Sequence, residues 1–145
     1  MTELITFDYV PFQVEAGKIK EFAKAIGSNN PVYFDEVRAK ENGHPAIPAP
    51  PTFATVIDFW NTRDFYQLFQ EIGLNPNYVL HGEQEYVYIR PIYAGDTIAA
   101  QAIVKECIQK KSMNFFKLET VYKNQQDELV LINRSTLIER TVAKK

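Results

Sequence analysis

The spacing of apolar residues divides the chain into a first half with helical periodicity and a second half rich in strand-forming residues. In residues 15–27, "EAGKIKEFAKAIG", the apolar positions have the spacing of one helix face: Ile19, Phe22, Ala23 and Ile26. Gly27 is a suitable residue to end this helix. Residues 35–43, "DEVRAKENG", begin with acids suited to a helix N-terminus and stop at Asn-Gly, so they predict a second, short helix.

A longer apolar stretch at 52–73, "TFATVIDFWNTRDFYQLFQEIG", predicts a third helix. Its first half is mostly apolar and its second half is amphipathic, which is typical of a buried helix that emerges into solvent. Thr52 follows Pro51 and is a candidate cap. The preceding residues 44–51, "HPAIPAPP", contain four prolines in eight positions, which excludes regular structure and predicts a crossing loop.

The chain after Asn77 consists of β-branched and aromatic runs separated by short polar turns. These runs, at 78–92, 96–110, 114–124 and 128–142, predict four consecutive antiparallel strands in a meander. With the extended start and the helices, this gives an α+β layout in one domain over 1–145. A long apolar helix wrapped by an antiparallel sheet is the hot-dog fold.

Composition narrows the classes of partner and compartment. The 145 residues are 46% hydrophobic, enough for one core, and the formal net charge of −2 gives no reason to expect nucleic acid or an anionic membrane as partner. The single cysteine, Cys107, excludes an intrachain disulfide and is expected to be buried as a small hydrophobe. No window is apolar enough for a membrane span, and we expect a cytoplasmic protein.

Three stretches carry a resemblance to a known family: "IGSNNPVYFDEVRA" at 26–39, "NGHPAIPAPPTF" at 42–53 and "YVYIRPIYAGDTI" at 86–98. With them the chain resembles the MaoC-like hydratases and dehydratases, which process (R)-3-hydroxyacyl or enoyl thioesters. It is most similar to the FAS1-like dehydratase, or MaoC N-terminal, branch. That branch includes the mycobacterial (3R)-hydroxyacyl-carrier-protein dehydratase subunits, which work as heterodimers.

The resemblance also shows where the chain departs from the catalytic branch. That branch carries a loop of the form Gly-Asp-x-Asn-Pro-hydrophobic-His, in which Asp and His hold and deprotonate the attacking water. Gly27, Asn30, Pro31 and Val32 match this pattern, but Ser28 stands in place of the Asp and Tyr33 in place of the His. Asp and His are unprotonated near pH 7, whereas Ser and Tyr are not, so this loop can orient a water but should not activate it.

The resemblance therefore implies a subunit that shapes the pocket while a partner with an intact Asp and His supplies the chemistry. Ser28 and Tyr33 are the degenerate catalytic positions. The residues expected to contact substrate are Gly27, Asn29, Asn30, Pro31 and Phe53. Asn29, Asn30 and Pro31 are also ordinary turn formers, and Phe53 is an ordinary core residue, so a structural role is the alternative for each.

The two histidines offer a second candidate site. His44 lies in a loop between Gly43 and Pro45, where exposure to solvent is expected. His81 begins a strand, and some hot-dog dehydratases of a separate branch pair a strand His with a helix carboxylate, here Asp58. A buried carboxylate has a shifted pKa, which is useful for catalysis but costly without a partner.

These residues are compatible with three functions. The chain is a hydratase or dehydratase component, a non-catalytic binding protein for acyl thioesters, or a thioesterase that relies on Asp58. In each case the ligand is an acyl-CoA or acyl-carrier-protein thioester, and the chain forms a homodimer or a heterodimer with a MaoC-like catalytic subunit. We expect no cofactor and no metal, since there is no Cys/His cluster and no phosphate-binding loop.

Overall fold

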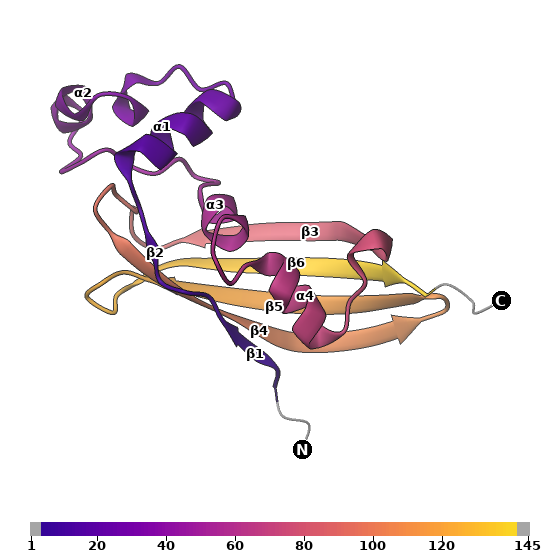
Figure 1. Ribbon diagram of the computed structural model, residues 1–145. Coiled ribbons are helices and arrows are strands. Elements are labelled where there is room, and N and C mark those ends of the chain that lie inside the picture. Colours follow the sequence, from indigo (N-terminus) through magenta and orange to yellow (C-terminus); the bar gives the residue numbers. More distant parts are fainter. Residues whose placement is uncertain (1–3, 142–145) are drawn as a thin grey trace.

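An antiparallel sheet of six strands curves around two short helices in the computed structural model, which describes residues 4–141 (Figure 1). The long strands are β3 (Val79–Tyr88), β4 (Thr97–Lys110), β5 (Met113–Lys123) and β6 (Leu129–Arg140). Two short N-terminal strands, β1 (Thr6–Asp8) and β2 (Phe12–Gln13), both pair with β4. The predicted α+β hot-dog fold is confirmed.

The strand order differs from the predicted meander. Only β4, β5 and β6 follow one another as neighbours, and β3 pairs with β6 at the edge of the sheet, in the order β1-β4-β5-β6-β3. The prediction of four consecutive neighbours was wrong because residues 89–96 are a crossing connection and not a hairpin turn. In that connection Ala94 N–H donates to the Ile47 carbonyl and Gly95 N–H to the Val14 carbonyl, which ties it to the N-terminal part of the chain.

The long apolar stretch forms two helices, α3 (Ala54–Phe59) and α4 (Phe65–Ile72), instead of one continuous helix. Asp64 is the N-cap of α4 and forms a complete capping box. Its carboxylate accepts from backbone N–H groups, and the side-chain oxygen of Gln67 accepts from the Asp64 N–H. Thr52 is not a cap, because α3 starts at Ala54 with no side-chain bond at its N-terminus. Both helices lie over the same face of the sheet (Figure 1).

The remaining helices gather beyond one end of the sheet (Figure 1). They are α1 (Ala16–Ala25), the 3-10 turn η1 (Pro31–Tyr33) and α2 (Glu36–Glu41); a second 3-10 turn, η2 (Pro76–Tyr78), leads into β3. Gly27 follows α1 with φ of +74°, the left-handed backbone that glycine adopts most readily at a helix end. Both predicted helices of this region are therefore present.

The core fills the space between the sheet and the helices. Its largest fully buried side chains include Phe7, Phe53, Ile57, Leu68, Tyr122 and Leu137. Cys107 does not belong to it: the thiol is exposed, so the prediction of a buried cysteine was wrong. Cys107 lies opposite Phe116 beyond an irregularity in the β4–β5 pairing between Val104 and Glu106, where the alternation of buried and exposed residues in β4 has ended.

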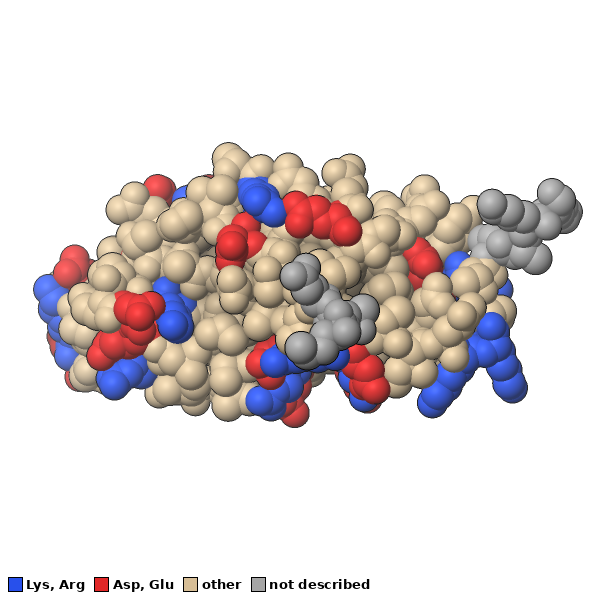
Figure 2. Space-filling model, turned by 90° about the horizontal axis from the view of Figure 1, so that it is seen from below, with Lys and Arg blue, Asp and Glu red and all other residues tan. Residues whose placement is uncertain are grey.

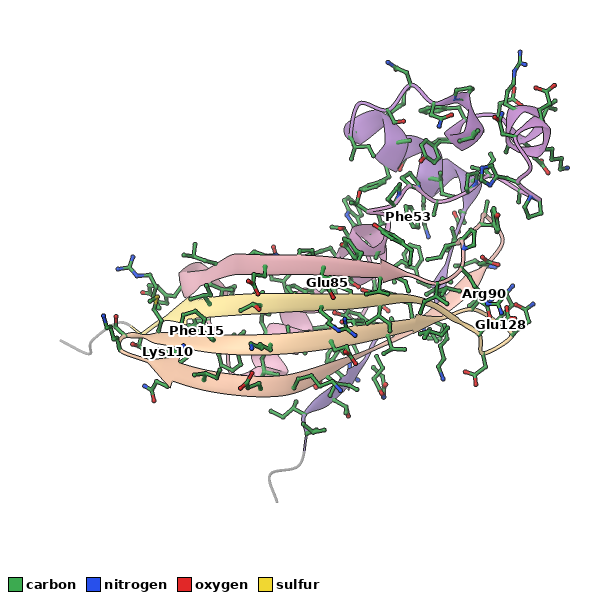
Figure 3. The ribbon with its side chains drawn as sticks, turned by 180° about the vertical axis from the view of Figure 1, so that it is seen from behind. Phe53, Glu85, Arg90, Lys110, Phe115 and Glu128 are labelled. Carbon is green, nitrogen blue, oxygen red and sulfur yellow. The ribbon has the colours of Figure 1, made fainter. Side chains whose placement is uncertain are left out.

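The outer face of the sheet carries paired charges. Arg134 bonds Glu119 at 3.0 Å and Glu85 at 2.8 Å across three strands, and Glu85 lies in the middle of this face (Figure 3). Acidic and basic side chains are interspersed on the molecule seen from below (Figure 2). Among residues 4–141, no helix has the length and apolar character needed to cross a membrane.

Candidate functional site

The loop at 27–33 folds as two consecutive turns held by its own side chains. The Ser28 hydroxyl accepts from the Asn30 N–H at 3.3 Å, and Asn30 Oδ1 accepts from the Val32 N–H at 3.2 Å, which caps η1. Pro31 stands at the first position of η1, where its missing N–H costs nothing. Val32 is 7% exposed, and its side chain packs in the core and holds the loop in place.

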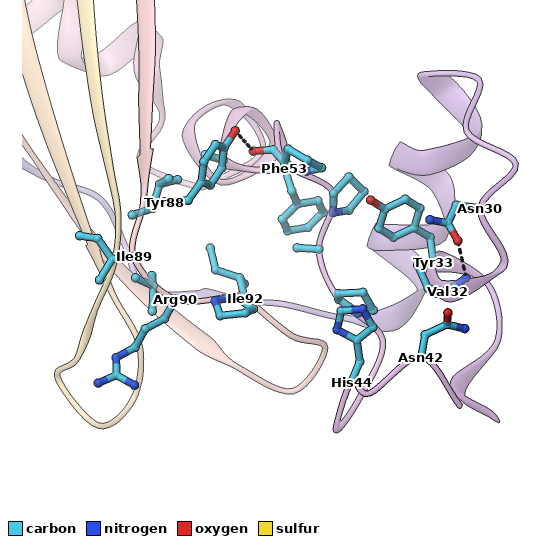
Figure 4. A pocket seen from close by; sticks show the side chains of 18 residues that line it. Asn30, Val32, Tyr33, Asn42, His44, Phe53, Tyr88, Ile89, Arg90 and Ile92 are labelled. Atoms are coloured by element: carbon cyan, nitrogen blue, oxygen red, sulfur yellow. Dashed lines mark hydrogen bonds between the residues drawn. The ribbon is translucent and has the colours of Figure 1, made fainter. Parts of the chain in front are cut away.

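This loop forms one side of a cavity of about 540 Å³ (Figure 4). Asn30, Val32 and Tyr33 face it from the loop, while Tyr88, Ile89 and Ile92 face it from the end of β3 and the following connection. Phe53 closes the space between the two sides, and its ring is held edge-on by Phe12 and Phe22. The lining is mostly apolar with a few polar groups, which suits an acyl chain with a polar end.

The structure brings only part of the predicted set to this cavity. Asn30, Tyr33 and Phe53 line it. Gly27, Ser28, Asn29 and Pro31 are not among its lining residues. The half-buried Ser28 hydroxyl is occupied within the turn by the Asn30 N–H, so its observed contact is structural. Asn29 is exposed, as expected of a turn former.

Several lining residues were not predicted as site residues. The Tyr88 hydroxyl donates to the Pro51 carbonyl at 3.0 Å and so joins β3 to the proline-rich loop (Figure 4). Arg90 lies on the same side of the cavity as Tyr88 and pairs with Glu128 at 3.6 Å; the two side chains lie near each other in Figure 3. Both belong to the stretch "YVYIRPI", whose position beside the loop depends on how β3 is placed in the sheet.

His44 was expected to be exposed, but it is half-buried and also lines this cavity. Its Nδ1 lies 3.5 Å from the Tyr93 hydroxyl, and the two rings meet edge to face at 6.0 Å. The prediction of a free loop histidine was therefore wrong, because the connection after β3 folds against the proline-rich loop and brings Tyr93 to it.

Asp58 and His81 lie in a different place, and both line a second cavity between α3 and the sheet. Asp58 is 5% exposed, and its Oδ1 accepts from the Tyr122 hydroxyl at 2.6 Å. Burial raises the pKa of Asp58 to about 7, and the hydrogen bond from Tyr122 opposes the rise. His81 is exposed on β3. Within residues 4–141, no three His, Cys, Asp or Glu side chains gather in a way that could hold a metal ion.

Comparison with known proteins places this arrangement in a family. A UPF0336 protein of Streptomyces coelicolor is 39% identical over 95 residues, which are 66% of this chain and 63% of the relative. A UPF0336 protein of Saccharopolyspora erythraea is 32% identical over 133 residues, 92% of this chain and 85% of the relative. The matched segment thus spans just under two thirds of the first relative and most of the second.

A solved structure shows the same fold. The C-terminally truncated HadBC (3R-hydroxyacyl-ACP dehydratase) complex of Mycobacterium tuberculosis contains a chain with a TM-score of 0.79 and 23% identity, matched over 94% of this chain and 98% of that one. At this identity the likeness shows the fold alone. The sequence of residues 4–133 matches the family described as FAS1-like, dehydratase domain region. The chain therefore belongs to the FAS1-like dehydratase domain family.

Proposed function

We propose that the chain is a component of a MaoC-like (R)-specific enoyl-thioester hydratase or (3R)-hydroxyacyl-thioester dehydratase. Its loop cavity holds the acyl part of a CoA or carrier-protein thioester, and a partner chain with an intact Asp and His supplies the acid and base at that site. The observation that carries this proposal is the loop at 27–33, which is ordered over an apolar cavity while Ser28 and Tyr33 replace the two catalytic residues.

The composition of the cavity supports a ligand with an apolar chain. Its walls combine Ile89, Ile92 and Phe53 with the amide of Asn30 and the hydroxyl of Tyr33. Apolar surface contributes most of the affinity for a fatty chain, and a few fixed polar groups orient the polar end. Without a carboxylate or imidazole at positions 28 and 33, these groups bind and orient but do not remove a proton near pH 7.

The free edge of the sheet supports a partner chain. Among residues 4–141, β3 pairs only with β6, so its other edge presents unpaired backbone groups along ten residues. Large apolar side chains of this strand are exposed: Leu80 is 59% exposed and Tyr88 58%. A second chain that extends the sheet here would cover them and lie next to the Tyr88 side of the loop cavity.

The test restores the missing pair. We expect the double variant Ser28→Asp with Tyr33→His to hydrate 2-enoyl-CoA esters at least about 100-fold faster than the unchanged loop, since a positioned acid or base contributes about 10²- to 10⁴-fold. The loss of enoyl-thioester absorbance measures the rate. The matched control, Asn29→Asp with Phe34→His, adds the same groups one position along the chain and should give no gain. A double variant that binds the thioester without any gain contradicts the loop assignment.

A further inference from the structure

The cavity between α3 and the sheet is separate from the loop cavity, and no residue lines both. It has a volume of about 310 Å³. Its polar lining includes Asp58 on α3, His81, Gln84 and Tyr86 on β3, and Asn133 and Ser135 on β6, together with Thr52 and Thr55. Phe59 and Phe65 supply apolar wall. No Lys or Arg is among its lining residues.

A β-bulge aims His81 into this cavity. His81 lies opposite Leu137 and Glu83 opposite Thr136, so Gly82 is an extra residue without a partner on β6. Side chains alternate between the two faces of a strand, and Gln84 is three positions after His81, so a regular strand would place them on opposite faces. The extra residue puts both on the inward face, beside the buried Leu137 and Ser135.

The bulge leaves little room for a side chain at position 82. A Cβ at position 82 would lie 2.8 Å from Ile138 Cδ1 and 3.3 Å from the Thr136 carbonyl oxygen. A larger residue would displace the end of the Ile138 side chain and crowd the Thr136 carbonyl oxygen. Glycine fits at the bulge without these adjustments.

Asp58 on α3 is the carboxylic acid that lines this cavity. The Asp58 carboxyl has one hydrogen-bond partner among residues 4–141, the Tyr122 hydroxyl, and that bond occupies Oδ1. The neighbouring Gln84 amide donates to Asn133, which fixes two more polar side chains of the lining. With its pKa raised by burial to about 7, the carboxyl exists in both protonation states near neutral pH, as a proton donor or acceptor requires.

We propose that this cavity is a second acid–base site, in which Asp58 and His81 interconvert a short-chain enoyl thioester and its 3-hydroxyacyl form. The identity of the substrate rests on the proposed function, whereas the reacting residues differ from those of the loop. The bulge, the shared cavity and the single-partner carboxyl together carry the assignment.

The proton transfers of this reaction balance within the pair. In hydration, the neutral His81 imidazole takes one proton from water while the water oxygen bonds to Cβ. The electron pair of the double bond then takes the Asp58 proton at Cα. The exposed His81 releases its proton to solvent, and the Asp58 carboxylate takes one up, which restores both groups. Dehydration is the reverse, with Asp58 as base and His81 as acid, and no oxidant or reductant takes part.

The experiment measures hydration of crotonyl-CoA by the purified chain alone, followed by the loss of enoyl-thioester absorbance. We expect turnover by the unchanged chain and at least a 100-fold lower rate in Asp58→Asn and in His81→Gln. Asp127→Asn is the matched control, since Asp127 is exposed in the β5–β6 turn with φ of +60°, a conformation that Asn tolerates. It should keep the full rate.

The outcomes separate this proposal from the proposed function. His81 is exposed, so His81→Gln keeps the test valid even if Asp58→Asn does not fold. Turnover that survives both substitutions overturns the second site. Crotonyl-CoA that binds to the unchanged chain, by calorimetry, without turnover also overturns it and leaves the proposed function standing. A chain that neither binds nor turns over the thioester contradicts both proposals.

Discussion

At the scale of single residues, the buried carboxyl of Asp58 is the group most sensitive to conditions. Tyr9, Tyr86 and Tyr122 surround it, and burial raises the pKa of each of these hydroxyls, so they stay protonated over the physiological range. Asp58, with a folded-state pKa of about 7 against an ordinary value of 3.8, is the group that titrates. An uncharged carboxyl is therefore the form that the fold tolerates best.

This shift predicts how stability depends on pH. Because the folded pKa lies above the unfolded one, the folded state binds more protons between about pH 4 and pH 7. The stabilisation is complete below pH 4 and is lost as the pH rises to 7, at about 1 kcal/mol per pH unit. Asp58→Asn removes this titration, so the free energy of unfolding of the unchanged chain should fall relative to that of the variant between pH 5 and pH 7.

Urea unfolding of both proteins at pH 5, 6, 7 and 8 measures the effect, and the difference between them should level off above pH 7. Comparison of the two proteins at each pH cancels the titration of the exposed carboxylates that both share. A difference in unfolding free energy that is the same at all four values would mean that Asp58 is already ionised at pH 5 in the folded protein.

At the scale of elements, the break between α3 and α4 sets the position of the second cavity. The chain turns at Asn61, whose amide donates to the Val10 carbonyl at 2.5 Å, and then restarts a helix at Asp64. Arg63 lies over the Phe7 ring at 4.3 Å and bonds Glu71 at 2.5 Å. These contacts stabilise the bend, which leaves Asp58 near the end of a six-residue helix that faces the sheet.

Loss of the capping box should weaken this bend. Asp64→Ala removes the acceptor for the Tyr66 and Gln67 N–H groups, at 2.9 and 3.2 Å, and should cost about 1 kcal/mol of unfolding free energy. Gln70→Ala, an exposed substitution in the same helix, should stay within about 0.5 kcal/mol of the unchanged chain. Equal midpoints of urea unfolding for the two variants would show that Asp64 contributes little to the start of α4.

At the scale of the whole molecule, the sheet ends on β3 with its outer edge unpaired among residues 4–141. An exposed edge with apolar residues associates readily unless a charge or proline blocks it. Leu80 occupies this edge and is 59% exposed. The edge is also the boundary of both cavities, because Tyr88 lines one and His81 the other.

We expect the purified chain on its own to form a dimer through β3. Light scattering after size exclusion should give twice the 16.7 kDa of the chain. Leu80→Lys should weaken this dimer at least 10-fold, since a charge on an edge strand opposes strand addition. Leu4→Lys changes a residue of equal exposure away from the edge and should leave the dimer intact. A monomer at all concentrations for the unchanged chain contradicts the β3 interface.

The sequence by itself determined the local elements, and its resemblance to the MaoC-like family singled out the loop at 27–33. Periodicity placed α1 and α2, and β-branched runs placed the four long strands within a few residues of their observed bounds. The pattern around Asn30 and Tyr33 identified a loop that does line a cavity. These features depend on residues close together in the chain, whose spacing and backbone preferences are written directly in the sequence.

Only the tertiary structure decided which distant residues meet. The Asp58–Tyr122 hydrogen bond joins residues 64 positions apart, and the placement of β3 beside β6 brings Tyr88 to the loop cavity. One signal for the second cavity was present in β6, where Asn133 and Ser135 are polar at inward positions. Which partners satisfy such polar positions depends on sheet order and on the bulge at Gly82, which follow from packing across the whole chain and not from local spacing.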